Sequence, residues 1–335
     1  MRFNDIFKLT NENKTHREYK CNNVNINIDF ISDSALRVAV FNDNAKMLPT
    51  FTVNPNNNLS SFGRSRLSTD GFDCVAPVVE KFDNKEQFIL ACGVTVDLDL
   101  NNFILSYSKE SKFLFGDRPP LAYNFEGEFG NGSYHYITRE DDEHIFGLGD
   151  KSGPINKAGR VYRIETADSM GFDAEKTDPL YKHVPFYICE NSVGAYGIYY
   201  DTTDTSFVDL GREINKYFKT DDDCLVYYVF FGNKLSVLQQ YACLCGKQAF
   251  PPKWSFDYCG STMAYTDAPD AQNQMQNFLD KIKDLDLSCG GFYLSSGYTS
   301  IGNLRCVFNW NYDKFPNSKK FVADYNNAGI HLIPN

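Results

Sequence analysis

The sequence lacks the features that mark several large classes of protein. Its 33 lysine and arginine residues are outnumbered by 43 aspartate and glutamate residues, so the net charge is −10 over 335 residues. A nucleic-acid partner requires positive charge clustered on one face, and an anionic membrane surface attracts the same kind of patch. Apolar runs long enough for a membrane span are also missing. The sequence therefore predicts no nucleic-acid partner and no membrane partner.

Recognisable metal and redox motifs are missing as well. Ten cysteines are spread along the chain without a Cys-x-x-Cys pair, and the closest two are Cys243 and Cys245. No two of the five histidines lie four residues apart, and no Gly-x-Ser-x-Gly nucleophile motif is present. Free thiols in a reducing compartment are the simplest interpretation. Because Met1–Asp5 opens without an apolar signal core, we expect a cytoplasmic protein.

The first two thirds of the chain have the pattern of β-structure. The length allows about two domains. Apolar and polar residues alternate with period two in three segments, at 24–30, 36–40 and 94–100. This alternation places one face of a strand in a core and the other in water. Further short strands are expected at 134–138, 161–166, 184–189, 195–200, 207–210 and 225–231. Many short antiparallel strands predict a β-sandwich.

The pattern changes near residue 234. Apolar residues then fall at helical spacing up to Gly246, and Pro251-Pro252 breaks the chain. Beyond this break, strands are expected at 256–259, 291–294 and 330–333. One helix is expected after Asp267 as its N-cap, and a second is expected after Ser318 as its N-cap. This β-α-β-α-β order predicts a parallel sheet. The predicted domains are residues 1–245 and 246–335.

Five segments in the same order resemble glycoside hydrolase family 31. This family contains α-glucosidases, α-xylosidases and related α-glucosyltransferases. The resemblance runs from about residue 35 to the end of the sequence. Its segments are His144-Ile-Phe-Gly-Leu-Gly-Asp150, Ile164-Glu-Thr-Ala-Asp168, Asp178-Pro-Leu-Tyr-Lys-His-Val-Pro-Phe186, Pro251-Pro-Lys-Trp254, and Phe308-Asn-Trp-Asn311 with Phe315-Pro316.

The resemblance implies a fold of β plus α/β class. An N-terminal β-sandwich of galactose-mutarotase type is expected to precede a (β/α)8 TIM barrel, whose active site lies at the C-terminal ends of the strands. The family's enzymes are retaining and use two aspartates, whose carboxyl groups lie ~5–5.5 Å apart. The implied partner is an α-linked oligosaccharide or glucoside substrate. No metal and no organic cofactor is implied.

The first departure from the family pattern is length, because the barrel part of this chain is shorter than a full barrel. One β/α unit of such a barrel takes ~31 residues, so the segment from Pro251 to Asn335 holds only about three strands and two helices, an incomplete barrel. In the family, the nucleophile follows strand four and the acid follows strand six. Both positions are expected beyond Asn335, so the resemblance assigns no catalytic residue here. We therefore expect this chain alone to be inactive, with the missing C-terminal part of the barrel as a partner.

The second departure lies at strand two. Most family members end that strand with an Asp-x-Asp pair that holds the sugar. Here the aligned segment is Leu294-Ser295-Ser296-Gly297-Tyr298, so Ser295 and Gly297 replace the two acids. Hydroxyl and backbone groups still bond sugar hydroxyls, but without charge assistance. This suggests a divergent subgroup that acts by transfer or on another linkage.

The resemblance also implies candidate substrate-binding residues. Asp168 is expected on a sandwich loop that reaches over the barrel mouth, with a turn or capping role as the alternative. Ser295 and Tyr298 lie at the C-terminal end of strand two, the end of the barrel where active-site residues lie. The aromatic rings of Trp310, Phe308 and Tyr265 are suited to sugar faces or to the barrel mouth. Core packing is the alternative for all three rings, and it is favoured for Phe308.

A second function class remains open at this point. In place of a glycosidase that hydrolyses or transfers α-linked glucosyl units in its intact form, the chain could be a non-catalytic carbohydrate-binding protein. It could also be a structural relic of such an enzyme. The missing aspartate positions agree with either class.

Overall fold

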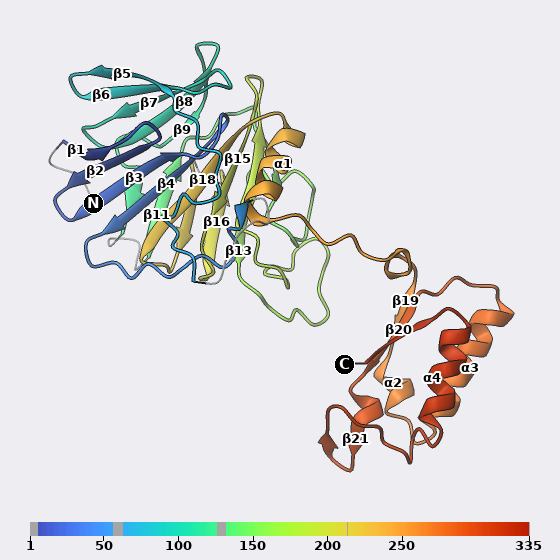
Figure 1. Ribbon diagram of the computed structural model, residues 1–335. Helices are drawn as coiled ribbons and strands as arrows, with labels where there is room; N and C mark the ends of the chain where they lie inside the picture. Colours follow the sequence, from blue (N-terminus) through green and yellow to red (C-terminus); the bar gives the residue numbers. More distant parts are fainter. Residues whose placement is uncertain (1–5, 56–62, 126–131, 213, 335) are drawn as a thin grey trace. The chain divides into compact units, whose positions relative to one another are not determined.

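The computed structural model describes residues 6–55, 63–125, 132–212 and 214–334 of the chain. The fold divides into two compact units, residues 1–248 and residues 249–335. The first is built almost entirely from strands, and the second combines strands with helices (Figure 1).

An eight-stranded antiparallel sheet forms the centre of the first unit. Its strands lie in the order β1-β2-β3-β4-β18-β15-β14-β12. Their bounds are β1 Lys8–Glu12, β2 His16–Cys21, β3 Val24–Phe30, β4 Ala35–Asn42, β18 Cys224–Gly232, β15 Ala195–Tyr200, β14 Phe186–Glu190 and β12 His144–Gly147. The partners Phe41 of β4 and Cys224 of β18 join an early segment of the chain to a late one.

Two five-stranded antiparallel sheets complete the β-structure of this unit. The first is a meander of β5 Val78–Phe82, β6 Lys85–Ile89, β7 Val94–Asp99, β8 Ile104–Lys109 and β9 Lys112–Gly116. The second has the order β10 Tyr123–Asn124, β11 Ser133–Ile137, β17 Lys216–Thr220, β16 Ser206–Leu210 and β13 Val161–Ile164. The strands expected at 24–30, 36–40 and 94–100 are confirmed as β3, β4 and β7.

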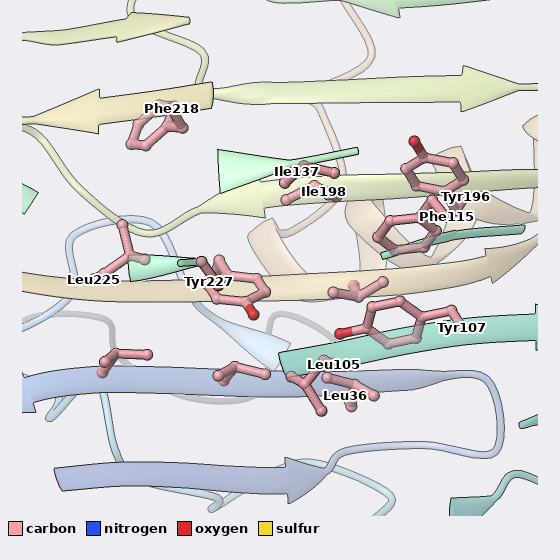
Figure 2. Close-up of a cluster of buried hydrophobic side chains, with 14 of the residues drawn as sticks. Leu36, Leu105, Tyr107, Phe115, Ile137, Tyr196, Ile198, Phe218, Leu225 and Tyr227 are labelled. Atoms are coloured by element: carbon pink, nitrogen blue, oxygen red, sulfur yellow. The ribbon is translucent and has the colours of Figure 1, made fainter. Parts of the chain in front are cut away.

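Side-chain alternation along β18 shows how the layers are built. Tyr227 and Phe231 point into a core shared by all three sheets, whereas Tyr228 and Phe230 enter a separate core on the opposite face. Figure 2 shows the shared core, with labelled side chains from β4, β8, β9, β11, β15, β17 and β18. Each large apolar side chain buried in this way stabilises the fold by roughly 1.5–3 kcal/mol.

Helix α1, Lys234–Cys245, covers the opposite face with Val237 and Leu244. Its first turn is closed by a capping box. The Asn233 side chain accepts from the Ser236 backbone amide at 3.0 Å, and Ser236 Oγ accepts from the Asn233 amide at 2.9 Å. The helix ends at Gly246, whose φ of +88° favours glycine.

Asp117 is the centre of a polar network buried in the shared core. Its carboxylate bonds to His135 Nε2 at 2.8 Å and accepts from the Tyr123 hydroxyl at 3.0 Å. The Tyr123 hydroxyl also meets that of Tyr227 at 2.8 Å, and His135 Nδ1 meets the Tyr200 hydroxyl at 3.0 Å. All five residues are buried. Burial without partners would be costly, so the network fixes how these strands pack.

The second unit is centred on a parallel sheet of β19 Cys259–Ser261, β20 Gly291–Ser295 and β23 His331–Pro334. Its main helices are α3 Ala271–Asp284 and α4 Ser318–Asn327. Shorter elements are the 3-10 helices η2 Lys253–Phe256 and η3 Gly297–Thr299, helix α2 Met263–Thr266, and the hairpin of β21 Ser300–Ile301 with β22 Leu304–Arg305.

Only one face of this sheet is covered within the described residues. Phe292 and Leu294 of β20 belong to a core with Leu279 of α3 and Phe321 of α4. Tyr293, between them, points the other way and is 46% exposed. A parallel sheet is ordinarily covered on both faces, so this face is suited to receive further structure.

Three local predictions for the second unit are wrong. Pro251-Pro252 leads into η2, closed by the Ser255 hydroxyl bonding to the Pro252 carbonyl at 2.8 Å, so the first strand starts only at Cys259. Asp267 ends α2 and does not cap the long helix, which begins after Asp270. The cap of α4 is Asn317 rather than Ser318: its side chain accepts from the Lys320 amide at 3.2 Å. At Pro252 and Asn317 a neighbouring turn or capping bond sets the boundary, whereas Asp270 makes no side-chain capping bond.

His16 gives a pH-dependent contribution to stability. Its ring meets Asp29 at 2.6 Å and Glu18 at 2.9 Å. Burial lowers the pKa of His16, but these bonds and charges outweigh it and raise the pKa above 6.5. The contribution is therefore complete below pH 6.5 and is lost as the pH rises through the folded-state pKa. We expect His16→Gln to lower the free energy of unfolding by about 1 kcal/mol at pH 5.5 and less at pH 8.5.

Urea titrations of both proteins at the two pH values measure this difference. His144→Gln is the matched control, because the His144 ring bonds to a neutral group, the Asn156 side-chain amide, at 3.0 Å, whereas the His16 ring bonds to two carboxylates. An equal loss for His16→Gln at both pH values would contradict the prediction.

Candidate functional site

Several polar and aromatic residues lie at or just beyond the C-terminal end of strand β20. Ser295 is its last residue and lies beside Pro334 of β23. Ser295 has φ of +52°, and the chain turns directly into η3. A Cβ at Gly297 would lie 2.5 Å from Thr266 Oγ1 and 2.6 Å from the Thr266 carbonyl carbon. This close approach leaves no room for an acidic side chain at position 297.

The segment after the β21–β22 hairpin is tied back to this end of the sheet. The Asn311 amide donates to the Tyr298 carbonyl at 2.9 Å, and the Asn311 side chain donates to the Ser300 carbonyl. Its side-chain oxygen also accepts from the Asp313 amide at 2.9 Å. These bonds hold the preceding residues 308–310 against η3.

Tyr298, Phe308 and Trp310 line one pocket of about 360 Å³, together with Asn309 and Pro334. Tyr298 and Trp310 meet edge to face, with ring centroids 5.0 Å apart. The Asn309 side-chain oxygen is buried and has no hydrogen-bond partner among the described residues. Aromatic walls with an unpaired acceptor are suited to a ring that carries both apolar faces and hydroxyl donors.

The structure distinguishes among the expected aromatic residues. Core packing of Phe308 is wrong: its side chain is fully exposed, because its backbone adopts φ of +59° and turns it outward. Trp310 lines the pocket and also packs on Phe315 at 5.3 Å, so its binding and packing roles coexist. Tyr265 lies on α2 and packs on Phe278 at 6.4 Å, apart from the residues that line the pocket.

An ionic cluster that the sequence did not reveal lies at the same end of the sheet. Asp267 pairs with Arg305 at 3.3 Å and with Lys314 at 3.9 Å. Arg305 also donates to Ser296 Oγ at 3.1 Å, and Lys314 donates to Ser300 Oγ at 3.0 Å. The partners are far apart in the chain, so no local pattern could indicate them. As exposed pairs they contribute little to stability, but they hold the hairpin beside Ser295.

Asp168 lies in the first unit, on the loop that follows β13. The base of this loop is closed by the Ala167 amide bonding to the Leu180 carbonyl at 3.0 Å. The Tyr181 hydroxyl donates to the Asp168 carboxylate at 2.6 Å, and this bond raises the pKa of Tyr181. Both side chains are exposed, so the loop presents an oriented carboxylate to solvent. Sequence reasoning missed Tyr181 as its partner.

Within the described ranges, no group of three or more His, Cys, Asp or Glu side chains is placed to hold a metal ion. The helices of the same ranges are all too short or too polar to cross a membrane.

Comparisons with known proteins agree with this architecture. The profile of the glycosyl hydrolase 31 N-terminal galactose mutarotase-like domain matches residues 25–209. That of the glycosyl hydrolases family 31 TIM-barrel domain matches residues 248–335. Both matches confirm the predicted fold class, a mutarotase-like sandwich followed by part of a barrel.

Curated relatives are considerably longer than this chain. Alpha-glucosidase 2 of Bacillus thermoamyloliquefaciens is 27% identical over 283 residues, which are 82% of this chain and 34% of that enzyme. An alpha-xylosidase of Saccharolobus solfataricus is 23% identical over 92% of this chain and 40% of its own length. The match thus spans between a fifth and two fifths of the length of these and the other curated relatives.

Solved structures show the same fold. A GH31 dextranase of Flavobacterium johnsoniae complexed with glucose matches 100% of this chain and 38% of its own chain, with a TM-score of 0.80 at 22% identity. A glucosidase II alpha subunit matches 100% of this chain and 43% of its own chain, with a TM-score of 0.76 at 13% identity.

Trp310 and Phe308 form a matched pair for a stability test. We expect Trp310→Ala to lower the free energy of unfolding by about 2–3 kcal/mol, because the indole packs on three aromatic rings yet stays partly exposed. Phe308→Ala should change it by less than ~0.5 kcal/mol, since the ring is fully exposed. Urea titrations followed by circular dichroism measure both. Equal losses in the two variants would contradict the assignment.

Proposed function

Because the chain belongs to glycoside hydrolase family 31, we propose that it provides the sandwich and the first barrel strands of a retaining enzyme. That enzyme cleaves or transfers α-linked glucosyl units. The observation that carries the proposal is the pocket of Tyr298, Phe308 and Trp310 at the C-terminal ends of β20 and β23, where barrel enzymes bind their substrates.

The pocket supplies the groups that a sugar ring needs. Trp310 and Phe308 offer ring faces, and the unpaired Asn309 oxygen accepts from a sugar hydroxyl. Ser295 and Tyr298 offer hydroxyls at the same end of β20, and Tyr265 packs α2 on Phe278 of α3. In this proposal Asp168 contributes a carboxylate from its own loop, held in place by Tyr181.

The two reacting carboxylates are proposed to come from residues outside positions 1–335. Retention requires a pair ~5–5.5 Å apart. The carboxylate at this end of the described sheet, Asp267, is paired with Arg305 and Lys314, which makes it a poor nucleophile. The uncovered face around Tyr293 is the surface that the remaining barrel units would cover. That missing part of the barrel is the proposed partner, and residues 1–335 alone are proposed to be inactive.

The residues at the end of β20 support the proposal that this chain belongs to a divergent subgroup of the family. With Ser295 and a tightly packed Gly297, a sugar there meets neutral hydroxyl and backbone groups, where most family members present two acids. Neutral contacts are weaker, so other subsites must hold the substrate. This favours transfer or another linkage over plain maltose hydrolysis. A cytoplasmic location is also proposed, supported by ten cysteines that are all free thiols.

A non-catalytic carbohydrate-binding role is the second candidate. It is favoured by one observation: the described residues that line the aromatic pocket all lie between Tyr298 and Pro334. The following assay separates the two.

We expect residues 1–335 to show no turnover of 4-nitrophenyl α-glucoside. The same chain fused to the later barrel strands of the Bacillus α-glucosidase should show turnover, because the fusion restores the carboxylate pair. Release of nitrophenolate is the measurement. Turnover by residues 1–335 alone that is lost in Asp168→Ala would overturn the proposal, and an inactive but sugar-binding fusion would favour the second candidate.

In the active fusion, Asp168→Asn should lower kcat/KM by about 10–100-fold, since the charged acceptor is lost. Tyr181→Phe should lower it by a smaller factor of about 2–10, because only the orientation of Asp168 changes. A Tyr181→Phe effect as large as that of Asp168→Asn would contradict this order of roles.

A further inference from the structure

A second cavity lies entirely within the first unit, at the base of the Asp168 loop. Its volume is about 480 Å³, within the range of small-molecule sites. Segments far apart in the sequence form its wall. The lining side chains include Glu165, Thr166, His183, Thr203, Thr205 and Tyr241.

Part of the cavity wall is held by hydroxyl groups whose hydrogen bonds are satisfied. The Thr52 hydroxyl pairs with the Tyr199 hydroxyl, and Thr202 donates to the buried Asp222 carboxylate at 3.0 Å. Tyr241 stacks on Phe186, with ring centroids 3.9 Å apart. These contacts give the cavity a fixed shape before any ligand enters, which reduces the entropic cost of binding.

The outer wall carries hydrogen-bonding groups that have no partner. The hydroxyls of Thr166, Thr203 and Thr205 make no hydrogen bond to any described residue, and each serves as both donor and acceptor. His183 Nε2 donates to the Asp204 carbonyl at 3.1 Å, which leaves Nδ1 as an acceptor. One oxygen of Glu165 pairs with Arg163 at 2.8 Å, and the other remains available.

This set of groups selects a class of ligand. Among the described lining residues there is no lysine and no arginine, and the nearby Arg163 is already paired with Glu165, so a phosphate or sulfate would meet a carboxylate and no unpaired cation in the lining. A purely apolar ligand would leave the hydroxyls unpaired, which is costly. A ligand with several neutral hydroxyls matches them one to one, and a carboxylate such as Glu165 accepts from two of them.

We propose that this cavity is a second binding site for a neutral sugar, formed by the sandwich alone. The site uses none of the barrel residues and involves no bond cleavage. Glu165 and Thr166 precede Asp168 directly in the chain, and His183 follows Tyr181 closely. Sugar bound here therefore orders both ends of the loop that carries Asp168.

The test uses residues 1–335 carrying Phe308→Ala, which removes an exposed ring of the barrel pocket. Maltose and isomaltose are titrated and binding is followed by saturation-transfer NMR and calorimetry. We expect millimolar dissociation constants, weakened at least tenfold by the added pair Thr203→Val and Thr205→Val and by Glu165→Gln. Thr203 is exposed and Thr205 half-buried, so these variants should keep the parent's melting temperature.

Three outcomes would overturn the proposal. These are no binding up to about 50 mM sugar, binding unchanged by the threonine and glutamate variants, or competition by inorganic phosphate. None of them bears on the barrel pocket, whose function is read from the activity of the fusion. Failure of this site and failure of the proposed enzyme are therefore separate results.

Discussion

The sandwich depends on one buried carboxylate, that of Asp117, which is only 3% exposed. It accepts from the Leu105 amide at 3.0 Å in one five-stranded sheet. It also bonds to Tyr123 and His135 of the other, and through them reaches Tyr227 and Tyr200 of the eight-stranded sheet. Apolar packing is tolerant of small shifts, but a buried charge with directional partners is not. The hydrogen bonds of Asp117 thus fix the positions of the three sheets relative to one another.

Strands such as β1 and β5, which lie largely exposed, were not predicted. Alternation along the chain did predict β3, β4 and β7, because each has one face in a continuous core. It was not enough to predict the network, since Tyr123 and Tyr227 are joined only by the sheet packing. In the second unit, local signals conflicted. Asp267 was predicted to begin the long helix, and only the fold shows that it ends the short helix α2, which Thr262 caps.

The candidate site was partly predictable from the sequence. Tyr298 and Trp310 lie in the same connection, between β20 and α4, and come together because the Asn311 amide bonds to the Tyr298 carbonyl at 2.9 Å. The exposure of Phe308 and the unpaired oxygen of Asn309 depend on individual backbone angles and bonds within a loop. At Gly297 the sequence and the structure each contribute. The sequence shows glycine where the family pattern has an acid, and the close approach of Thr266 explains why no larger residue fits.

The pairing of β4 with β18 has a consequence for how the protein is made. Strands β1–β4 leave the ribosome early as a meander whose last strand has one open edge. The partner of Phe41 is Cys224. At a synthesis rate of ~5–20 residues per second, β18 is therefore made roughly 10–40 s after β4. Contacts this distant in sequence make folding slow. During synthesis, the open edge of β4 is therefore available for pairing with another chain until β18 has been made.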